Sequence, residues 1–231
     1  MKANLNETLP PLRRKKILPL IADIELRADK TLLEKGGCII ATNHLGRLDS
    51  MMAYYLLDNE DIIQPFTDKY KDKLFFRFIA WWLEMTWLKR GQADMKAIKE
   101  FISRLKKGGV MVIAPEGTRS KSASLLKGES GVIFIAAQAG APIIPVAVTG
   151  TEDAVVKSRL KRFQRLKITL TAGEPFILPP MKGADRERLM HEATEEVMCR
   201  IAALLPESYR GYYKDFPRVQ EILTTTKNQV S

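Results

Sequence analysis

The chain has 231 residues, of which 45% are hydrophobic and 28% charged, a composition typical of a folded globular protein and not of a disordered one. Its 37 basic and 27 acidic side chains give a formal net charge of +10, which favours an anionic partner such as a nucleic acid, an acidic membrane surface or a phosphorylated substrate. The two cysteines, Cys38 and Cys199, are too few for a disulfide framework and indicate a reducing compartment.

The first 35 residues contain a basic run at 13–16 but no secretory signal, because a proline and charged residues interrupt the apolar stretch that follows. We predict a basic, helical N-terminal segment at 1–35. The most apolar window, residues 74–88, is shorter than a bilayer crossing and carries Arg77 and Glu84, so we expect no transmembrane span. Any membrane attachment of this cytoplasmic protein is therefore expected to be peripheral.

Short apolar runs rich in Val, Ile or Thr alternate with longer stretches of helical periodicity. The predicted strands are residues 38–42, 62–67, 110–114, 143–148 and 166–171. The predicted helices are residues 50–57, 71–84, 94–106, 129–139 and 185–205. This alternation predicts a single α/β domain at 36–205 with a mixed, largely parallel sheet flanked by helices, followed by a C-terminal extension at 206–231. Polar residues that follow the strands would lie along one rim, where open sheets bind ligands.

The first polar rim segment follows the strand at 38–42 and contains His44, Gly46 and Asp49. On a continuous helix, side chains five positions apart point roughly 140° away from each other, so His44 and Asp49 would not meet. If His44 ends the strand and Asp49 begins the helix, the chain folds back and the carboxylate fixes the imidazole tautomer, leaving the other nitrogen as a base. A structural histidine with Asp49 as a helix cap is the alternative interpretation.

The second rim segment follows the strand at 110–114 and combines a turn proline with a carboxylate, a glycine, a hydroxyl and an arginine: Pro115, Glu116, Gly117, Thr118 and Arg119. Gly117 permits close backbone approach to a ligand, Arg119 offers a planar fork for phosphate, and Glu116 can accept hydrogen bonds from hydroxyls. The alternative is an ordinary turn with solvated charges.

Two further basic groups lie at loop positions. Lys127 precedes the helix predicted at 129–139, and Arg90 stands next to Gly91 after an aromatic run. Either side chain can hold a phosphate, although a surface loop residue is the alternative. The spacing of glycine and lysine is not that of a nucleotide-binding P-loop.

Together these segments resemble the glycerolipid acyltransferase family, the family of 1-acylglycerol-3-phosphate acyltransferases. The resemblance extends over residues 36–174. It rests on an Asn-His pair followed by four residues and Asp (Asn43, His44 and Asp49), on Arg90-Gly91, on the unsubstituted Pro-Glu-Gly-Thr-Arg-Ser at 115–120, and on an apolar strand with a central proline at 141–146.

The resemblance implies an enzyme of phospholipid biosynthesis that moves a fatty acyl group from acyl-CoA or acyl carrier protein to the free hydroxyl of 1-acylglycerol 3-phosphate. It implies His44 as the general base and Asp49 as its partner. The expected acceptor site comprises Arg90, Glu116, Gly117, Thr118, Arg119 and Lys127. We expect no metal and no cofactor. We also expect no acyl-enzyme, since the chain lacks a G-x-S-x-G elbow and Cys38 lies within a strand. Glycerol 3-phosphate or another lysophospholipid is the alternative acceptor.

The aromatic segment 70–88 predicts an apolar groove for the acyl chain or a contact with the bilayer interface, with a buried core helix as the alternative. Basic runs at 13–16 and 157–167 predict contact with anionic lipid headgroups. A nucleic-acid-binding module is the rival of a different class, but aromatic residues are not interleaved with the lysines, so no nucleic-acid partner is expected. A hydrolase that uses His44 on water is a nearer rival. A catalytically inactive lipid-binding relative is disfavoured by the complete His–Asp pair.

Overall fold

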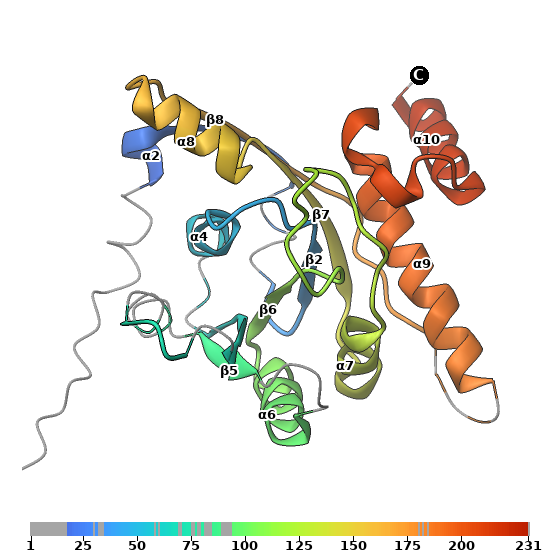
Figure 1. Ribbon diagram of the computed structural model, residues 1–231. Helices are drawn as coiled ribbons and strands as arrows, with labels where there is room; N and C mark the ends of the chain where they lie inside the picture. Colours follow the sequence, from blue (N-terminus) through green and yellow to red (C-terminus); the bar gives the residue numbers. More distant parts are fainter. Residues whose placement is uncertain are drawn as a thin grey trace, which may run out of the picture.

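A computed structural model gives the fold (Figure 1) and describes residues 18–29, 31, 35–57, 59, 61–68, 71–74, 77, 80, 85–88, 94–179, 181, 183 and 185–230. Six strands form the main sheet in the order β1-β8-β7-β2-β6-β3. The strands are β1 (Ala22–Arg27), β2 (Ile39–Thr42), β3 (Ile62–Ile63), β6 (Val110–Ile113), β7 (Ile143–Thr149) and β8 (Leu166–Ala172). The four strands β7, β2, β6 and β3 are parallel, whereas β8 is antiparallel to β7 and parallel to β1. The predicted mixed, largely parallel sheet is confirmed.

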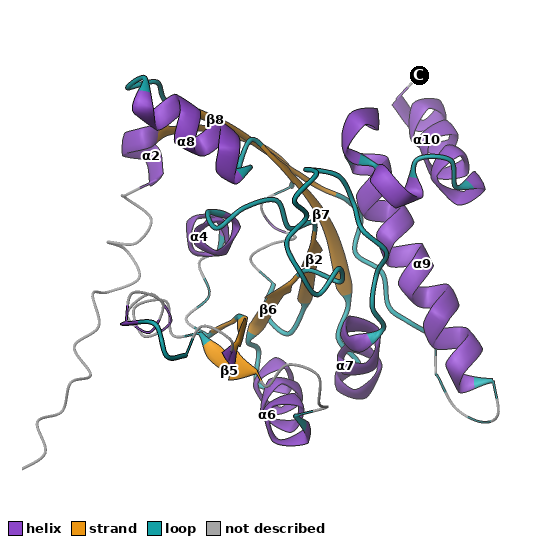
Figure 2. Cartoon of the chain, in the orientation of Figure 1, coloured by secondary structure: helices purple, strands orange, loops and turns teal. Residues whose placement is uncertain are grey.

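Helices cover both faces of this sheet (Figure 2). One face packs against α6, α7 and α9, and the other packs against α4. The helix α10 packs on α9 from outside. The helices are α2 (Leu18–Ile21), α4 (Asp49–Leu56), α6 (Met95–Lys106), α7 (Gly131–Ala139), α8 (Asp153–Lys161), α9 (Arg186–Leu204) and α10 (Pro217–Val230), with short 3-10 turns η2 (Glu207–Tyr209) and η3 (Gly211–Tyr213).

Alternation along β2 explains how a single strand supports two hydrophobic cores. Ile39 and Ala41 lie in the cluster shared with α6, α7 and α9, whereas Cys38 and Ile40 lie in the cluster shared with α4. All four are buried, because successive side chains of a strand point to opposite faces and here both faces are covered. The strand is therefore apolar throughout and becomes polar only where it ends.

Eight of the ten predicted elements are found, and their ends differ by at most two residues from those predicted. The strand expected at 62–67 is divided: β3 joins the main sheet, and β4 (Pro65–Thr67) pairs with β5 (Thr86–Leu88) in a small parallel sheet. Gln64, between them, is buried and donates to the Ser50 carbonyl. Most of the helix expected at 71–84 lies outside the described residues.

The N-terminal segment corrects the sequence analysis at one point. Residues 22–27 were expected in a helical segment but form β1, the edge strand beside β8. The sequence Ala-Asp-Ile-Glu-Leu-Arg alternates strictly between apolar and polar residues, and the apolar ones are the more buried. This period of two is the signal of a half-buried strand, and the charged run before it obscured the pattern. Among the described residues, no helix has the length and apolarity that a membrane crossing needs.

Candidate active site

The carboxyl ends of β2, β6 and β7 meet at one rim of the sheet, because the three strands are parallel neighbours. Asn43 fixes the first of them: its side-chain amide donates to the Val148 carbonyl at 2.9 Å and accepts from the Val148 N–H at 2.8 Å. The Asn43 side chain, only 1% exposed, thus extends the ladder between β2 and β7 by one more pair of bonds. This holds the next residue, His44, at the rim.

His44 and Asp49 meet across the turn that separates β2 from α4. The Nδ1 atom of His44 lies 2.7 Å from Oδ2 of Asp49, and the same oxygen accepts the backbone N–H groups of Leu45 and Gly46 at 2.8 and 3.0 Å. Asp49 is 8% exposed, and its carboxylate bonds backwards into the turn rather than capping α4, whose N-cap is Leu48. The structure therefore supports the folded-back pair over the helix-cap interpretation.

Gly46 is required by the tightness of this turn. A Cβ atom at this position would lie 1.9 Å from the carbonyl oxygen of Thr151, in the loop after β7. The turn thus packs directly on the loop that follows β7. With Nδ1 held by Asp49, the Nε2 atom of the neutral imidazole is the one left to act as a base, and the His44 side chain is 28% exposed to a ligand.

Glu116 is a buried carboxylate that ties three segments together. Its Oε1 accepts the N–H of His44 at 2.9 Å and its Oε2 accepts the N–H of Leu126 at 2.8 Å, while the Ser120 N–H donates to the His44 carbonyl. Burial raises the pKa of Glu116, and the two backbone donors act in the opposite direction. Because both oxygens already accept backbone donors, the observed contacts position the main chain of His44; that Glu116 holds the acceptor stays a prediction.

Arg119 reaches the same rim through an ion pair that the sequence analysis did not foresee. Its guanidinium donates to Oδ2 of Asp153 at 2.7 Å, and Oδ1 of Asp153 accepts the backbone N–H of Arg47 at 3.0 Å. The Arg47 guanidinium lies 3.6 Å from the same carboxylate. Asp153 is in the first turn of α8, directly after β7, so a third polar rim segment completes the two that were predicted. Its signal was a polar run, 149–153, after an apolar strand.

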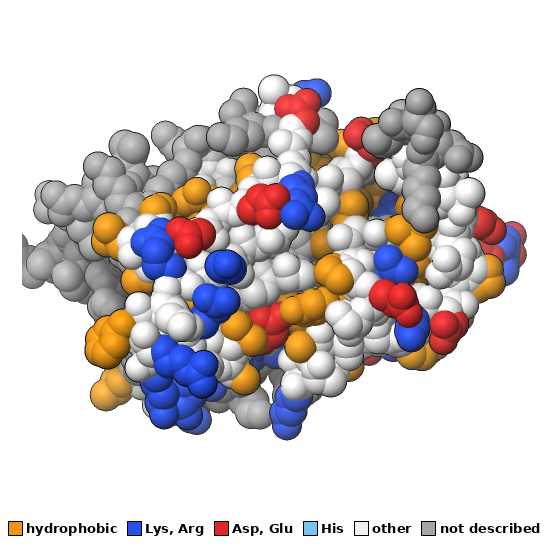
Figure 3. All heavy atoms as spheres, turned by 90° about the horizontal axis from the view of Figure 1, so that it is seen from above, with side chains coloured by type: hydrophobic (Ala, Val, Ile, Leu, Met, Phe, Trp, Pro, Cys, Tyr) orange, Lys and Arg blue, Asp and Glu red, His pale blue; other side chains and the backbone are white. Residues whose placement is uncertain are grey.

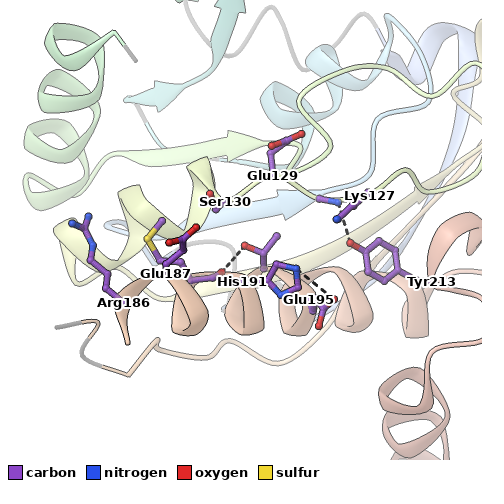
Figure 4. Close-up of a pocket in the computed structure, with 11 residues that line it drawn as sticks. Lys127, Glu129, Ser130, Arg186, Glu187, His191, Glu195 and Tyr213 are labelled. Atoms are coloured by element: carbon purple, nitrogen blue, oxygen red, sulfur yellow. Dashed lines mark hydrogen bonds and ion pairs between the residues drawn. The ribbon is translucent and has the colours of Figure 1, made fainter. Parts of the chain in front are cut away.

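The other predicted site residues differ in where they lie. Gly117, exposed next to Glu116, has φ +63°, a backbone conformation that favours glycine. Thr118 is also exposed at the rim. Arg90 lies outside the described residues. Lys127 is exposed and lines a cavity of about 570 Å³ between residues 127–130 and α9, to which His44 does not contribute (Figure 4).

This α9 cavity holds the second histidine, which provides an internal comparison with His44. His191 faces Glu195 at 3.9 Å, and its side chain is 60% exposed. The cavity wall carries both signs of charge: Lys127 and Arg186 against Glu129, Glu187 and Glu195. His191 thus lacks the short, buried carboxylate contact that orients His44, and the geometry favours His44 as the base.

The C-terminal extension contacts the rim loops, which the sequence analysis missed. The Tyr209 hydroxyl donates to Oε1 of Glu152 at 2.6 Å, and the Tyr209 carbonyl accepts the Leu125 N–H at 2.9 Å. The Tyr213 hydroxyl accepts the Gly128 N–H at 3.0 Å. Burial, and for Tyr209 also the bond to Glu152, raises the pKa of both phenols to about 12. Residues 209–213 therefore brace the loop that carries Leu126, the second partner of Glu116.

The two cysteines are unsuited to nucleophilic chemistry. Cys38 and Cys199 are both about 1% exposed. Burial raises the pKa of Cys38 to about 11 and that of Cys199 to about 12. Since the thiolate is the reactive form, neither side chain is a candidate for a covalent acyl carrier.

Comparison with known proteins points to one family. A family model described as Acyltransferase matches residues 23–149, from β1 to the end of β7. A 1-acyl-sn-glycerol-3-phosphate acyltransferase of Cocos nucifera is 35% identical over 120 residues, or 51% of this chain and 37% of the relative. The enzyme of the same name from Escherichia coli (strain K12) is 31% identical over 145 residues, or 59% of this chain and 57% of the relative. The two matches thus span 37% and 57% of the relatives' own length.

A solved structure extends the likeness to most of the fold. The 1-acyl-sn-glycerophosphate acyltransferase of Thermotoga maritima superposes with a TM-score of 0.56 and 23% identity, covering 81% of this chain and 73% of that one. At this identity the match shows a shared fold. The family model's match ends at Thr149, so Glu152, Asp153, α8 and the C-terminal segment all lie beyond the matched residues.

Proposed function

The chain belongs to the acyltransferase family, and from this premise we propose that it transfers a fatty acyl group from a thioester to the free hydroxyl of 1-acylglycerol 3-phosphate. One observation carries the proposal: the 2.7 Å contact between His44 and Asp49 at a rim that also holds Arg119. The names of the relatives from Cocos nucifera and Escherichia coli support this acceptor.

The reaction needs a single proton acceptor and an oriented nucleophile. Nε2 of His44 takes the proton of the acceptor hydroxyl as its oxygen attacks the thioester carbonyl carbon, and Asp49 stabilises the imidazolium that forms. Collapse of the tetrahedral adduct breaks the carbon–sulfur bond, and the imidazolium returns its proton to the departing thiolate. The products are the acylated glycerol lipid and the free thiol, with no intermediate on the protein.

The two arginines at Asp153 supply the acceptor's phosphate site in this proposal. Arg119 and Arg47 lie on one carboxylate, at 2.7 and 3.6 Å, and their side chains are 30% and 65% exposed. A guanidinium matches the geometry of phosphate, so the acceptor's phosphate would bind the two arginines either together with Asp153 or in its place. Arg90, Gly117, Thr118 and Lys127 stay predicted contacts.

Acyl-CoA and acyl carrier protein are the two donors that we propose, with no further cofactor. The acceptor lies in a membrane, so the protein would work at an anionic membrane surface by peripheral contact. Glycerol 3-phosphate and lysophospholipids with larger headgroups are the alternative acceptors, and a screen that pairs both donors with these acceptors separates them. Label recovered as free fatty acid instead of glycerolipid would identify a hydrolase.

His44→Ala tests the proposal, and His191→Ala is its matched control. General-base removal should lower the turnover number by about 10²–10⁴-fold, because the acceptor hydroxyl is then attacked without a positioned base. The thermal midpoint should stay close to that of the wild type, since His44 belongs to neither hydrophobic cluster. His191→Ala should transfer at the wild-type rate. A folded His44→Ala protein with wild-type turnover would refute the assignment.

A further inference from the structure

The helix α8 contributes little to the folded core. None of its nine residues is fully buried: Val156 packs partly against the core on the α4 side, whereas Val155 and Leu160 are 40% and 43% exposed. The turn that follows carries Phe163, which is 99% exposed and has φ +53°. A bulky side chain is disfavoured at positive φ, and this ring contributes no burial in return. Folding alone therefore gives no reason for a phenylalanine here, and such an outlier points to a surface with a function.

The short helix α2 belongs to the same surface. Arg165, in the turn after α8, donates to the carbonyls of Pro19, Leu20 and Ala22 at 2.8, 3.0 and 2.7 Å. Figure 1 shows α2 beside α8 and β8 at the upper left. Leu20 is 75% exposed and Ile21 is 36% exposed. We call the combined surface of α2, α8 and the turn 162–165 the α8 face.

The α8 face is strongly basic. Within it, residues 153–165 hold five basic side chains (Lys157, Arg159, Lys161, Arg162 and Arg165) against one acidic side chain, Asp153, a net charge of +4. Arg165 pairs with Asp23 of β1 at 2.7 Å. Asp153 already pairs with Arg119, and in the described part of the chain no ion pair engages Lys157, Lys161 or Arg162. Arg159 and Arg162 also line a hollow of about 370 Å³. Seen from above, Lys and Arg side chains lie beside hydrophobic ones on this side of the molecule (Figure 3).

We propose that the α8 face docks the protein on an anionic lipid surface, with Phe163 entering the interfacial layer and the surrounding Lys and Arg side chains contacting lipid phosphates. Aromatic rings favour this layer, and each basic residue near an anionic leaflet adds attraction. The exposed Leu20 side chain enters the same layer. The net charge of +4 selects an anionic surface over a neutral one.

The position of α8 connects docking to the reaction. Its first residue, Asp153, binds Arg119 at the His44 rim, and Phe163 follows its last turn. At 1.5 Å per residue, nine helical residues span about 14 Å, so the rim lies one short helix from the docked ring. This link rests on the proposed lipid acceptor, whereas lipid binding itself does not depend on the chemistry.

Vesicle co-sedimentation tests the proposal with the full chain and two kinds of vesicle: phosphatidylcholine alone, or phosphatidylcholine and phosphatidylglycerol in equal parts. The wild type should bind the anionic vesicles and bind the neutral ones at least about tenfold more weakly. Phe163→Asn should reduce binding to anionic vesicles about tenfold, by loss of the ring's apolar area. Asparagine tolerates positive φ, so this variant should unfold no earlier than the wild type.

Matched controls separate a specific face from general charge and hydrophobicity. Ile177→Asn removes a 71% exposed apolar side chain after β8, and Lys106→Gln/Lys107→Gln removes two cations at the end of α6. Both should bind as the wild type does. Lys157→Gln/Lys161→Gln should lose most of the preference for anionic vesicles.

Wild-type binding by both α8-face variants would overturn the inference. A loss of rate only with acyl carrier protein as donor, with vesicle binding intact, would assign the face to an acidic protein instead. Transfer to a detergent-dispersed acceptor keeps the two proposals distinct. If docking fails but this transfer persists, the proposed function stands without the α8 face; if vesicles bind but no acceptor is acylated, the proposed function fails alone.

Discussion

Two segments hold the His44 rim in place: the turn at 43–49 and the C-terminal segment at 206–213. Their contacts join residues that lie at different distances along the chain. In the turn, His44 and Asp49 are five residues apart. The C-terminal segment reaches Glu152 from 57 residues away through Tyr209, and Gly128 from 85 residues away through Tyr213. The turn orients the reacting group, whereas the C-terminal segment fixes the loops on which the turn rests.

The two segments also differ in how many donors the bonded oxygen of their buried carboxylate accepts, and how closely. Oδ2 of Asp49 accepts an imidazole and two backbone N–H groups. Glu152 is 7% exposed, and its Oε1 accepts the Tyr209 hydroxyl at 2.6 Å and the Gly150 N–H at a long 3.4 Å. Among the described residues, none bonds the other oxygen of either carboxylate, Oδ1 of Asp49 or Oε2 of Glu152. A substitution in the turn should therefore lower mainly the turnover number, and a substitution in the C-terminal segment should lower mainly the stability.

Asp49→Asn should have the largest effect and act on the turnover number. The neutral amide no longer stabilises the imidazolium, so we expect a loss of about 10²–10⁴-fold in kcat with acceptor KM nearly unchanged. Steady-state kinetics with varied acceptor measures both constants. Asp94→Asn is the control: Asp94 caps α6 through the Ala97 N–H, and asparagine caps a helix equally well. Equal kcat values for the two variants would show that the His44–Asp49 contact has no catalytic part.

Tyr209→Phe should have an intermediate effect, felt mainly in stability. It leaves Glu152 buried with only the long Gly150 contact, at a cost of about 1–3 kcal/mol in the free energy of unfolding. Denaturant unfolding measures this loss. The turnover number should fall by up to about tenfold as the braced loop loosens, with the pH dependence of kcat unchanged because His44 and Asp49 are intact.

Tyr212→Phe is the control for this experiment. Tyr212 is the neighbouring phenol, 51% exposed, and its hydroxyl makes no hydrogen bond within the described chain. It should match the wild type in stability and rate. If both variants behave alike, the Tyr209–Glu152 bond is not what braces the rim.

The contrast between the segments also explains what the sequence could predict. His44 and Asp49 lie at either end of a short turn, so their contact could be predicted on the condition that the strand ends at one and the helix begins at the other, with a helix cap as the alternative. Strands that are apolar on both faces indicate a covered parallel sheet. The pairing of Tyr209 with Glu152 depends on the path of the chain after α9, which brings residue 209 back to the loop after β7. Hydrophobic periodicity does not predict that path. Arg119 illustrates the same limit. The sequence predicted it as a phosphate-binding side chain, but not its ion pair with Asp153, which lies 34 residues away.

Misassigned segments had local causes. β1 was hidden by the basic run before it, although its alternation was complete. The predicted strand at 62–67 was divided because Pro65 lacks an N–H and cannot continue a ladder on both sides. The helix α8 buries no side chain, so it carries no apolar stripe by which sequence periodicity reveals a helix. Hydrophobic periodicity predicts only elements that bury one face, so it does not reveal an element that contacts mainly its neighbours in sequence.

The smallest effect that we predict appears at alkaline pH and isolates the C-terminal segment without altering the turn. Burial raises the pKa of Tyr209 and of Tyr213 from the ordinary value of 10 to about 12, so the fold prefers the protonated phenols. Their contribution to stability is fully present below pH 10 and is lost as the pH rises from 10 towards 12, because the unfolded chain releases these protons first.

Two measurements check this last prediction: absorbance titration of tyrosinate and the denaturant midpoint across the same pH range. Tyr209 and Tyr213 should titrate late in the native protein and normally once it is unfolded. Tyr209→Phe/Tyr213→Phe should abolish the late step and flatten the fall in stability above pH 10, whereas Tyr212→Phe should change neither. A late step that survives in the double variant would mean that the raised pKa values belong to tyrosines elsewhere. The bracing at 209–213 would then be too open to water to hold the rim.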